Sequence, residues 1–253
     1  MAEGDTILRI ARRIDAALAG DALEVSTPNP RGRAAMVDRL DGLVLERARS
    51  AGKNLLLEFG DLVLHSHLGM GGSWHVYRRG ERWRRPAGSA WVVMRGARNE
   101  AAQWGGPTLR VLRHSQVALD PRLAALGPDI LNPDFDPEEA VASIRRAGGD
   151  RQLGDALLDQ RAIAGIGNIF KSEGCFAARL DPWRRVDEVN DMELRRVVLE
   201  TRQLMEEAVA AGRQPRAIYR SAGRSCPVCG TPVRSHGQGD DNRRTYWCPR
   251  CQV

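Results

Sequence analysis

Two Cys-x-x-Cys pairs near the C-terminus, Cys226/Cys229 and Cys248/Cys251, constrain the fold more than any other feature of this 253-residue sequence. The 18 residues between the pairs fall within the spacing of a four-thiolate structural zinc site. A redox-active dithiol is the alternative, but one pair would suffice for that chemistry. We therefore expect one structural Zn²⁺, bound by all four cysteines, with the intervening residues forming a β-hairpin that the metal stabilises.

The chain is long enough for one large or two modest domains with hydrophobic cores of their own. Apolar residues make up 42% and charged residues 28%, as in ordinary globular proteins, and no apolar run approaches the ~20 residues that cross a bilayer. The first residues also lack the features of a signal peptide. We therefore expect a cytoplasmic protein without a membrane partner and without disulfides, in which Cys175 is a small buried apolar side chain.

Hydrophobic periodicity divides the chain into a β-rich and a helical part. Apolar residues from Ile7 to Leu18 recur at helical spacing, which predicts a helix at about 6–19 that ends at Gly20. Short β-like runs follow, and Gly60-Asp61 between two of them is typical of a hairpin turn. We expect an antiparallel sandwich with strands at 43–45, 55–59, 62–65, 91–94 and 109–112.

After Asp120-Pro121 the β pattern stops. A proline-punctuated linker at 126–137 ends in a predicted N-cap, Asp136, with Pro137 at the first helical position. Gly165-Ile166-Gly167 predicts a tight turn between two helices. The predicted helices span about 137–147, 152–160, 168–178 and 189–211. The fold class is therefore α+β multidomain, with domains at 1–120, 121–212 and 213–253.

The distribution of charge points to an anionic partner. The net charge is +6 and the pI is near 9.5. Residues 213–253 carry eight arginines against only Asp240 and Asp241. Arginine forms bidentate contacts with phosphate oxygens, although a solvated basic surface would have the same composition. Lys53 and Lys171 are the only lysines, which makes each of them a residue to explain.

Several motifs, in order along the chain, resemble the formamidopyrimidine-DNA glycosylase and endonuclease VIII family. The resemblance covers essentially the whole chain and rests on Ala2-Glu3-Gly4-Asp5-Thr6, Ala51-Gly52-Lys53, the run from Ser66 to Trp74, the run from Leu157 to Ile169 and the cysteine pairs. It implies an N-terminal β-sandwich with helices, a helix-two-turn-helix domain and a C-terminal zinc finger. It also implies a monomeric, nucleoid-associated enzyme that binds damaged DNA. The Glu-Gly opening is more similar to the endonuclease VIII branch, which favours oxidised pyrimidines as substrates.

The resemblance implies a catalytic role for the first residues. Removal of Met1 would expose the amino group of Ala2, which would attack C1′ of the damaged nucleotide, while Glu3 acts as general acid and base. The alternative for Glu3 is an acidic residue favoured at the start of a helix. Ala2 departs from the proline of most relatives. Its imine must be protonated before it withdraws electrons, so strand cleavage is expected to be slower.

The resemblance also implies four DNA-contacting residues. Lys53 would contact the phosphates beside the lesion and support catalysis, and Met70 would fill the gap left by the flipped nucleotide. Asn168, at a helix start, and Arg243, in the finger, would bind backbone phosphate. The alternatives are a surface charge for Lys53, a core methionine for Met70, a helix cap for Asn168 and a solvated arginine. The segment Arg82-Trp83-Arg84-Arg85 either touches DNA or is a solvated loop.

Three functions remain open from the sequence. The first is a base-excision-repair DNA glycosylase with AP lyase activity. The second is a monofunctional glycosylase with little lyase activity because of Ala2. The third is a catalytically weak protein that binds abasic or distorted DNA, which would have no reason to retain Glu3 and Lys53.

Overall fold

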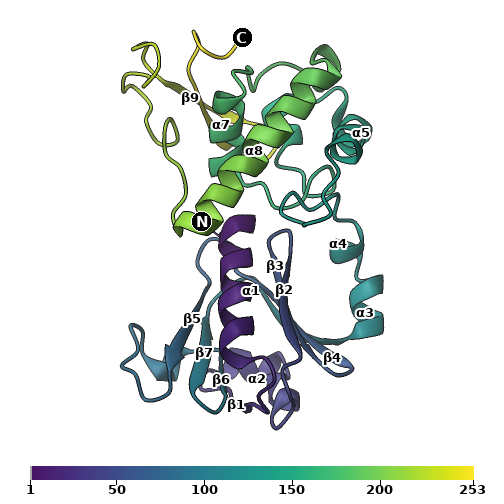
Figure 1. Cartoon of the computed structure of the whole chain (residues 1–253), viewed down its shortest axis with the longest axis vertical. Coiled ribbons are helices and arrows are strands. Elements are labelled where there is room, and N and C mark those ends of the chain that lie inside the picture. Colours follow the sequence, from purple (N-terminus) through teal and green to yellow (C-terminus); the bar gives the residue numbers. More distant parts are fainter. Residues whose placement is uncertain (1) are drawn as a thin grey trace. The chain divides into compact units, whose positions relative to one another are not determined.

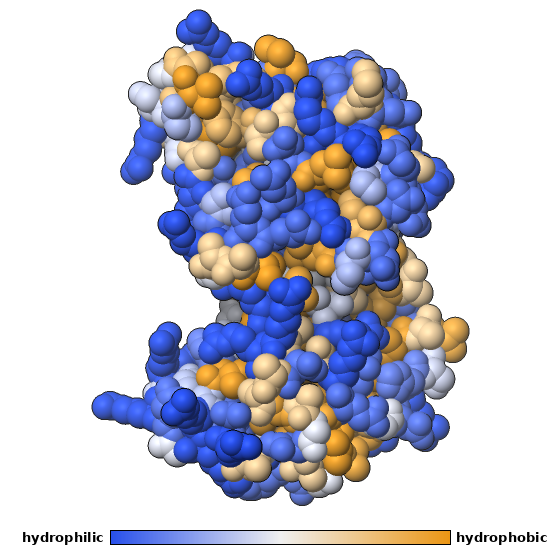
Figure 2. Space-filling view, viewed as in Figure 1, coloured by the Kyte–Doolittle hydropathy of each residue, from blue (hydrophilic) through white to orange (hydrophobic). Residues whose placement is uncertain are grey.

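The computed structural model describes residues 2–253, which fall into two compact units, one extending to Ala124 and one from Ala125 to Val253 (Figure 1). Each has its own hydrophobic core. Among residues 2–253, no helix combines the length and the apolar character needed to cross a membrane. The face of the molecule drawn in Figure 2 is mostly hydrophilic, with smaller apolar patches between charged side chains.

The first unit contains two four-stranded antiparallel sheets, with strand orders β1-β6-β7-β5 and β2-β3-β4-β8. The strands are β1 (Glu24–Ser26), β2 (Arg47–Ala51), β3 (Asn54–Phe59), β4 (Leu62–His67), β5 (Ser73–Arg78), β6 (Val92–Arg95), β7 (Asn99–Trp104) and β8 (Thr108–Arg113). Short helical segments connect or follow them: α2 (Pro30–Ala34), η1 (Val37–Leu40), η2 (Ala87–Ser89), α3 (His114–Leu119) and α4 (Pro121–Ala124).

Helix α1 (Gly4–Leu18) closes the core between the two sheets. In Figure 1 it runs alongside β5 and β7 on one side and β2 and β3 on the other. The predicted periodicity is confirmed, because Ile7, Ala11, Ile14 and Leu18 are all buried on one side of the helix. Their burial against both sheets fixes the position of the start of the helix.

The predicted strands in this unit are partly right. The runs at 55–59, 62–65, 91–94 and 109–112 correspond to β3, β4, β6 and β8. The run at 43–45 is not a strand and forms only an isolated bridge between Ala22 and Val44. The sequence pattern missed β1, β2, β5 and β7. Of these, β1, β2 and β5 are edge strands, which need no continuous apolar run because one side lacks a neighbouring strand.

The second unit packs helices around an apolar core and ends in a hairpin. Its elements are α5 (Pro137–Gly148), α6 (Leu153–Ala156), α7 (Asn168–Ala177), η3 (Val186–Glu188), α8 (Asp191–Ala211), β9 (Arg234–Gln238) and β10 (Arg243–Trp247). Strands β9 and β10 pair antiparallel, from Arg243 opposite Gln238 to Trp247 opposite Arg234. In Figure 1, α7 lies beside the long helix α8, and these two helices pack together.

The turn and cap predictions in this unit are confirmed. Asp136 caps α5 by accepting a hydrogen bond of 2.9 Å from the N–H of Glu138. Gly165 has φ of +103°, a conformation that side chains with a Cβ rarely adopt, so the tight turn before α7 depends on it. The helix predicted at 152–160 is too long. Helix α6 ends at Ala156, and Asp159 then binds Arg151 and Arg161, which holds the chain in a turn.

Candidate active site and nucleic-acid interface

Glu3 lies at the start of α1 and is fully buried. It occupies the N-cap position, where its carbonyl accepts the N–H groups of Thr6 and Ile7, but its carboxylate does not cap the helix. The alternative of an acid favoured at the start of a helix is compatible with this position. Ala2 is half-buried beside it and packs against the same core.

Helix α1 and strand β2 bring Glu3 and Lys53 to the same end of the first unit. Asp15 of α1 accepts a hydrogen bond of 2.7 Å from the N–H of Ala48 in β2, which fixes one crossing point. From Asp15 back to Glu3 the helix rises about 18 Å, and from Ala48 forward to Lys53 the strand advances about 17 Å. Figure 1 shows the start of α1 and the β2–β3 turn at the same end.

Lys53 lies in the two-residue turn between β2 and β3, and its side chain is half-buried. His67, at the end of β4, pairs with Asn54 in the sheet register, which places it beside this turn. Burial and then the positive charges of Lys53 and Arg122 lower the pKa of His67. Lys53 and Arg122 thus form a positive pair beside the largely neutral His67, and this pair is suited to phosphate. The sequence analysis had no separate role for His67 or Arg122.

Met70 lies in the loop after β4, and 76% of its side chain is exposed. The interpretation of Met70 as a core methionine is therefore wrong. Gly69 has φ of +56°, and a Cβ there would lie 2.9 Å from the ring of Pro107. The loop is thus packed tightly against residues 105–107 while it presents the methionine to solvent. An exposed apolar side chain on a fixed loop is suited to insertion between bases.

A buried network lies beneath this end of the sheet. His65 Nε2 donates to Asn54 Oδ1 at 2.9 Å, and its Nδ1 accepts from Arg110 Nε at 3.1 Å. Arg110 also forms an ion pair of 2.5 Å with Asp120. Burial, followed by the charge of Arg110, lowers the pKa of His65 to about 4. His65 is therefore neutral at physiological pH and positions Asn54, the residue after Lys53.

In the second unit, Asn168 is the first residue of α7, and Gly167 rather than Asn168 is its N-cap. The alternative of a simple helix cap is therefore wrong. Asn168 is 8% exposed, and its Nδ2 donates to the carbonyl of Arg244 at 2.8 Å. The positive end of the helix dipole lies at the same place. Asn168 thus connects the start of α7 to the β9–β10 hairpin.

Lys171, the second lysine, is a structural link between α7 and the hairpin. It is fully buried, and its Nζ donates to Thr245 Oγ1 at 2.6 Å. Thr245 in turn donates to Gln238 Oε1 at 2.6 Å, across the β9–β10 pair. Together with the bond from Asn168, this chain of contacts fixes β10 on α7.

Arg243 begins β10 and is exposed, with Asp241 Oδ2 3.7 Å from its Nε. Arg244 follows it and is also exposed. Because α7 holds this strand, Arg243, Arg244 and the start of α7 belong to one fixed positive surface of the second unit.

The four predicted zinc ligands come together at the base of the hairpin. The Sγ atoms of Cys226, Cys229, Cys248 and Cys251 all lie within 4.8 Å of one another. Two of the separations are 3.9 Å, from Cys226 to Cys251, and 3.5 Å, from Cys229 to Cys248. Four thiolates at about 2.3 Å from a tetrahedral Zn²⁺ lie about 3.8 Å apart, so the arrangement fits this metal. Cys175 lies outside this cluster and is fully buried, and desolvation raises the pKa of its thiol to about 12.

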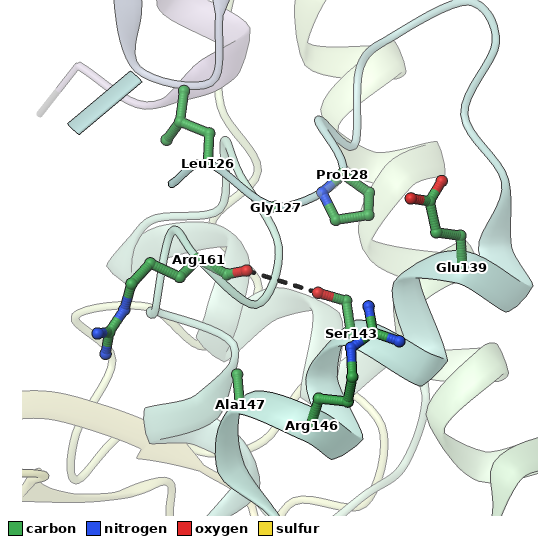
Figure 3. Close-up of a pocket in the computed structure, with 8 residues that line it drawn as sticks. All are labelled: Leu126, Gly127, Pro128, Glu139, Ser143, Arg146, Ala147 and Arg161. Atoms are coloured by element: carbon green, nitrogen blue, oxygen red, sulfur yellow. Dashed lines mark hydrogen bonds between the residues drawn. The ribbon is translucent and has the colours of Figure 1, made fainter. Parts of the chain in front are cut away.

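A separate shallow pocket of about 380 Å³ lies in the second unit and contains none of the predicted site residues (Figure 3). Ser143 donates to the carbonyl of Arg161 at 3.5 Å on its floor, and the Arg161 side chain points away from it. Its lining is Leu126, Gly127, Pro128, Glu139, Ser143, Arg146, Ala147 and Arg161.

Both units match models of known protein families. A family model described as the formamidopyrimidine-DNA glycosylase N-terminal domain matches residues 1–119, and one described as the formamidopyrimidine-DNA glycosylase H2TH domain matches residues 126–218. The whole chain is 40% identical to a Streptomyces coelicolor protein named probable endonuclease 8 2, of which it covers 94%. This chain belongs to the formamidopyrimidine-DNA glycosylase and endonuclease VIII family.

A further relative and a solved structure support this family membership and the fold. The whole chain is 35% identical to a Mycolicibacterium smegmatis protein named DNA-(apurinic or apyrimidinic site) lyase Nei2, of which it covers 99%. A crystal structure of Lactococcus lactis formamidopyrimidine-DNA glycosylase, bound non-covalently to DNA containing an AP site, matches with a TM-score of 0.83. That match covers 99% of both chains at 20% sequence identity, and it establishes the family fold. The predicted fold class and family are therefore confirmed.

Proposed function

We propose that this chain is a base-excision-repair DNA glycosylase with AP lyase activity, which removes oxidised bases from damaged DNA. The residues at one end of the first unit support the proposal. They are a fully buried carboxylate at the start of α1, a lysine in the β2–β3 turn and an exposed methionine in the loop after β4. The family and the names of its relatives support the same activity.

The proposed reaction begins after Met1 has been removed. The Ala2 amino group, whose ordinary pKa is near ~8, attacks C1′ of the damaged nucleotide, and the bond from C1′ to the base breaks. Glu3 protonates the ring oxygen of the deoxyribose, so that the sugar opens to an imine with Ala2. Glu3 then removes a C2′ proton, and β-elimination expels the 3′ phosphate. The burial of Glu3, directly after Ala2 in the chain, supports this role, because the acid is held next to the reacting amine.

Binding of the DNA is assigned to both units. Lys53, with His67 and Arg122 beside it, would hold phosphates next to the lesion, and Met70 would occupy the gap left by the flipped nucleotide. In the second unit, Asn168 at the start of α7 and Arg243 on the hairpin would bind backbone phosphate. The hydrogen bond between Asn168 and Arg244 supports joint action of these two elements.

Zinc is the proposed metal of the Cys226, Cys229, Cys248 and Cys251 site. The fit of the four sulfur positions to a tetrahedral thiolate site supports it. The metal would have no part in the reaction and would hold the base of the hairpin that carries Arg243. Domain boundaries at 120/121 and 212/213, a monomeric state and a cytoplasmic, nucleoid-associated location complete the proposal.

Oxidised pyrimidines are the expected substrate class, because the Glu-Gly opening resembles the endonuclease VIII branch and the Streptomyces coelicolor relative is named endonuclease 8. The presence of Ala2 instead of proline supports a second candidate function, that of a glycosylase with weak lyase activity. Its imine is neutral until protonated, whereas proline forms a permanent iminium cation.

Borohydride trapping tests the proposal. The protein is incubated with an oligonucleotide that carries an abasic site, borohydride is added, and the adduct is mapped by mass spectrometry. We expect a covalent complex at Ala2. Tight DNA binding with neither an adduct nor base release, for a protein whose N-terminus is verified as Ala2, would contradict the enzymatic assignment.

The variant Glu3→Gln tests the proposed role of Glu3 as the general acid and base. We expect base excision to fall by about 10²- to 10⁴-fold while the dissociation constant for abasic DNA stays unchanged. Glu46→Gln, which removes an exposed carboxylate from the same unit, is the matched control and should retain full activity. Unchanged turnover of the Glu3 variant would remove this residue from the mechanism.

A further inference from the structure

Aromatic side chains cover the outer face of the β1-β6-β7-β5 sheet, the face turned away from α1. Along β5, Trp74 and Val76 belong to the main core with α1, whereas Tyr77 belongs to a separate cluster with Trp83 and Trp104. Trp83 comes from the loop between β5 and β6, residues 79–91, so this loop folds back over the sheet. We call Tyr77, Trp83 and Trp104 the aromatic cluster.

The aromatic cluster fixes the loop at several points. Trp83 stacks on Tyr77, with ring centroids 5.5 Å apart and planes 11° from parallel, and meets Trp104 edge-on at 5.7 Å. Its Nε1 donates to Glu100 Oε1 at 2.6 Å. Trp104 Nε1 donates to the carbonyl of Pro86 at 3.2 Å. A solvated loop would need none of these anchors.

Arg85 is pre-positioned by the same cluster. Its guanidinium lies 5.6 Å from the ring centroid of Trp104, and its Nη1 donates to Ser73 Oγ at 2.7 Å. Ser73 is directly opposite Trp104 in the β5–β7 register. Arg85 nevertheless remains exposed. A planar guanidinium that is already stacked loses little conformational entropy when it binds a further anion.

The positive charge on this face exceeds the negative charge of Glu81 and Glu100 beside it. Arg82, Arg84 and Arg85 are exposed, and within residues 2–253 none of them forms an ion pair with a carboxylate. Below them, the pKa of His75 is lowered first by burial and then by the charges of Arg85 and Arg84, so both guanidinium groups lie near this ring.

This area adjoins the Met70 loop. Ser73 follows Met70 by three residues and begins β5. At the end of β7, Trp104 leads into Gly105-Gly106-Pro107, which packs against Gly69 and Gly72 of the Met70 loop. The charged face and the loop are thus parts of one continuous surface of the first unit.

We propose that Arg82, Arg84 and Arg85, held on the aromatic cluster, bind the phosphate backbone of DNA beside the gap that Met70 enters. The proposal rests on the proposed function for the identity of the polyanion. Guanidinium groups are the side chains best matched to phosphate oxygens, and fixed guanidiniums next to an inserted residue would hold the distorted backbone at that point. Of the two sequence alternatives for the segment 82–85, the proposal takes DNA contact.

The salt dependence of DNA binding tests this surface. The variant Arg84→Gln/Arg85→Gln is compared with Arg39→Gln/Arg98→Gln, which removes the same charge from exposed positions elsewhere in the unit. Fluorescence anisotropy gives the dissociation constant for a duplex with a tetrahydrofuran abasic analogue at several salt concentrations. We expect the slope of log K against log salt to decrease by about 1 to 2 for the first variant. The control loses less than half as much.

A neutral-phosphate scan locates the contact. Each phosphate near the abasic analogue is replaced in turn by methylphosphonate. We expect one or two positions within about three nucleotides of the lesion at which wild type loses affinity, while Arg84→Gln/Arg85→Gln loses none. Equal losses for both proteins at every position would overturn the proposal, as would an unchanged salt slope in a variant that remains folded by circular dichroism.

Failure of this surface is distinguishable from failure of the proposed function. Borohydride trapping is run on the same preparations. A wild-type protein that traps abasic DNA, together with an unchanged slope for the variant, overturns the arginine surface alone. A wild-type protein that neither traps nor releases bases, together with a reduced slope, overturns the enzyme and supports the surface.

Discussion

Ala2 determines the kind of intermediate that the proposed reaction forms. A primary amine gives an imine that withdraws electrons only when protonated, whereas proline gives an iminium with a fixed charge. We therefore expect Ala2→Pro to increase the rate of strand cleavage at an abasic site by roughly tenfold at pH 8. Denaturing gels of single-turnover reactions measure this rate.

The comparison of Ala2→Pro with wild type requires that both proteins have a free N-terminal amine. Mass spectrometry must show that Met1 is absent from both proteins, because an acylated nitrogen cannot attack C1′. Equal cleavage rates with both N-termini free would mean that protonation of the imine does not limit the reaction.

His65 makes stability depend on pH. Its pKa is about 4 in the folded protein against an ordinary value near 6.5, so the unfolded chain binds more protons between these values. The free energy of unfolding should therefore fall as the pH is lowered from about 6.5 to about 4, by up to about 3 kcal/mol. His67 and His75, whose pKa values are also lowered, act in the same direction. Urea unfolding at pH 7 and pH 5 measures the change.

His65→Gln removes the titrating group and retains a side chain able to bond Asn54. We expect this variant to lose more than half of the difference between the two pH values. The complete pH dependence in the variant would assign it to other groups.

At the scale of elements, the hydroxyl of Thr245 joins α7 to β10 in addition to the bond from Asn168. Thr245 Oγ1 accepts from the buried Lys171 and donates to Gln238. Thr245→Val retains the shape and removes both bonds, so we expect a loss of about 1 to 3 kcal/mol in unfolding free energy. DNA affinity should fall as well, because β10 carries Arg243. Thermal denaturation and anisotropy measure the two effects.

The matched control is Thr27→Val, a half-buried threonine of the first unit that is far in sequence from α7 and from the cysteines. If both variants bind DNA as wild type does, the contact between α7 and β10 does not position the hairpin.

The elements that the sequence predicted are those with a strong local signal. Strands β3 and β4 were predicted because their apolar residues are continuous and buried. Strand β2 has the sequence RARSA and strand β7 has NEAAQW, and neither contains such a run. They form strands because they pair with neighbouring strands, which their own composition does not reveal. The turn at Gly165 and the cap at Asp136 were predictable because each depends on one residue type.

The candidate site was predictable to a smaller extent from the residues alone. The spacing of the cysteines predicted their cluster, whereas Ala2, Glu3, Lys53, Met70 and Asn168 were singled out through the family resemblance. The network of His65, Arg110 and Asp120 joins strands that are 45 residues apart in sequence, and no local pattern indicates such a contact. The same holds for the bond between Asn168 and Arg244.

At the scale of the whole molecule, the two units have separate cores, so we expect loss of the metal to unfold part of the second unit and to leave the first unit folded. Removal of zinc by a chelator should unfold the hairpin, because four converging thiolates without a metal repel one another. We expect DNA affinity to decrease at least tenfold, while residues 2–124 remain folded. Hydrogen exchange followed by mass spectrometry should show faster exchange at 222–253 and no change in β3 and β4. A metal-free protein with full DNA affinity would contradict the structural role of the site.

The burial of Cys175 allows thiol alkylation to distinguish two kinds of opening in the second unit. Four thiols lie at the hairpin, and the fifth is enclosed among apolar side chains with a pKa of about 12. An alkylating reagent needs a thiolate and access, so it should modify the hairpin thiols as soon as the metal leaves and Cys175 only when the helical core opens. The number of alkyl groups on the intact protein, counted over time, therefore reports separately on local opening of the hairpin and on unfolding of the second unit.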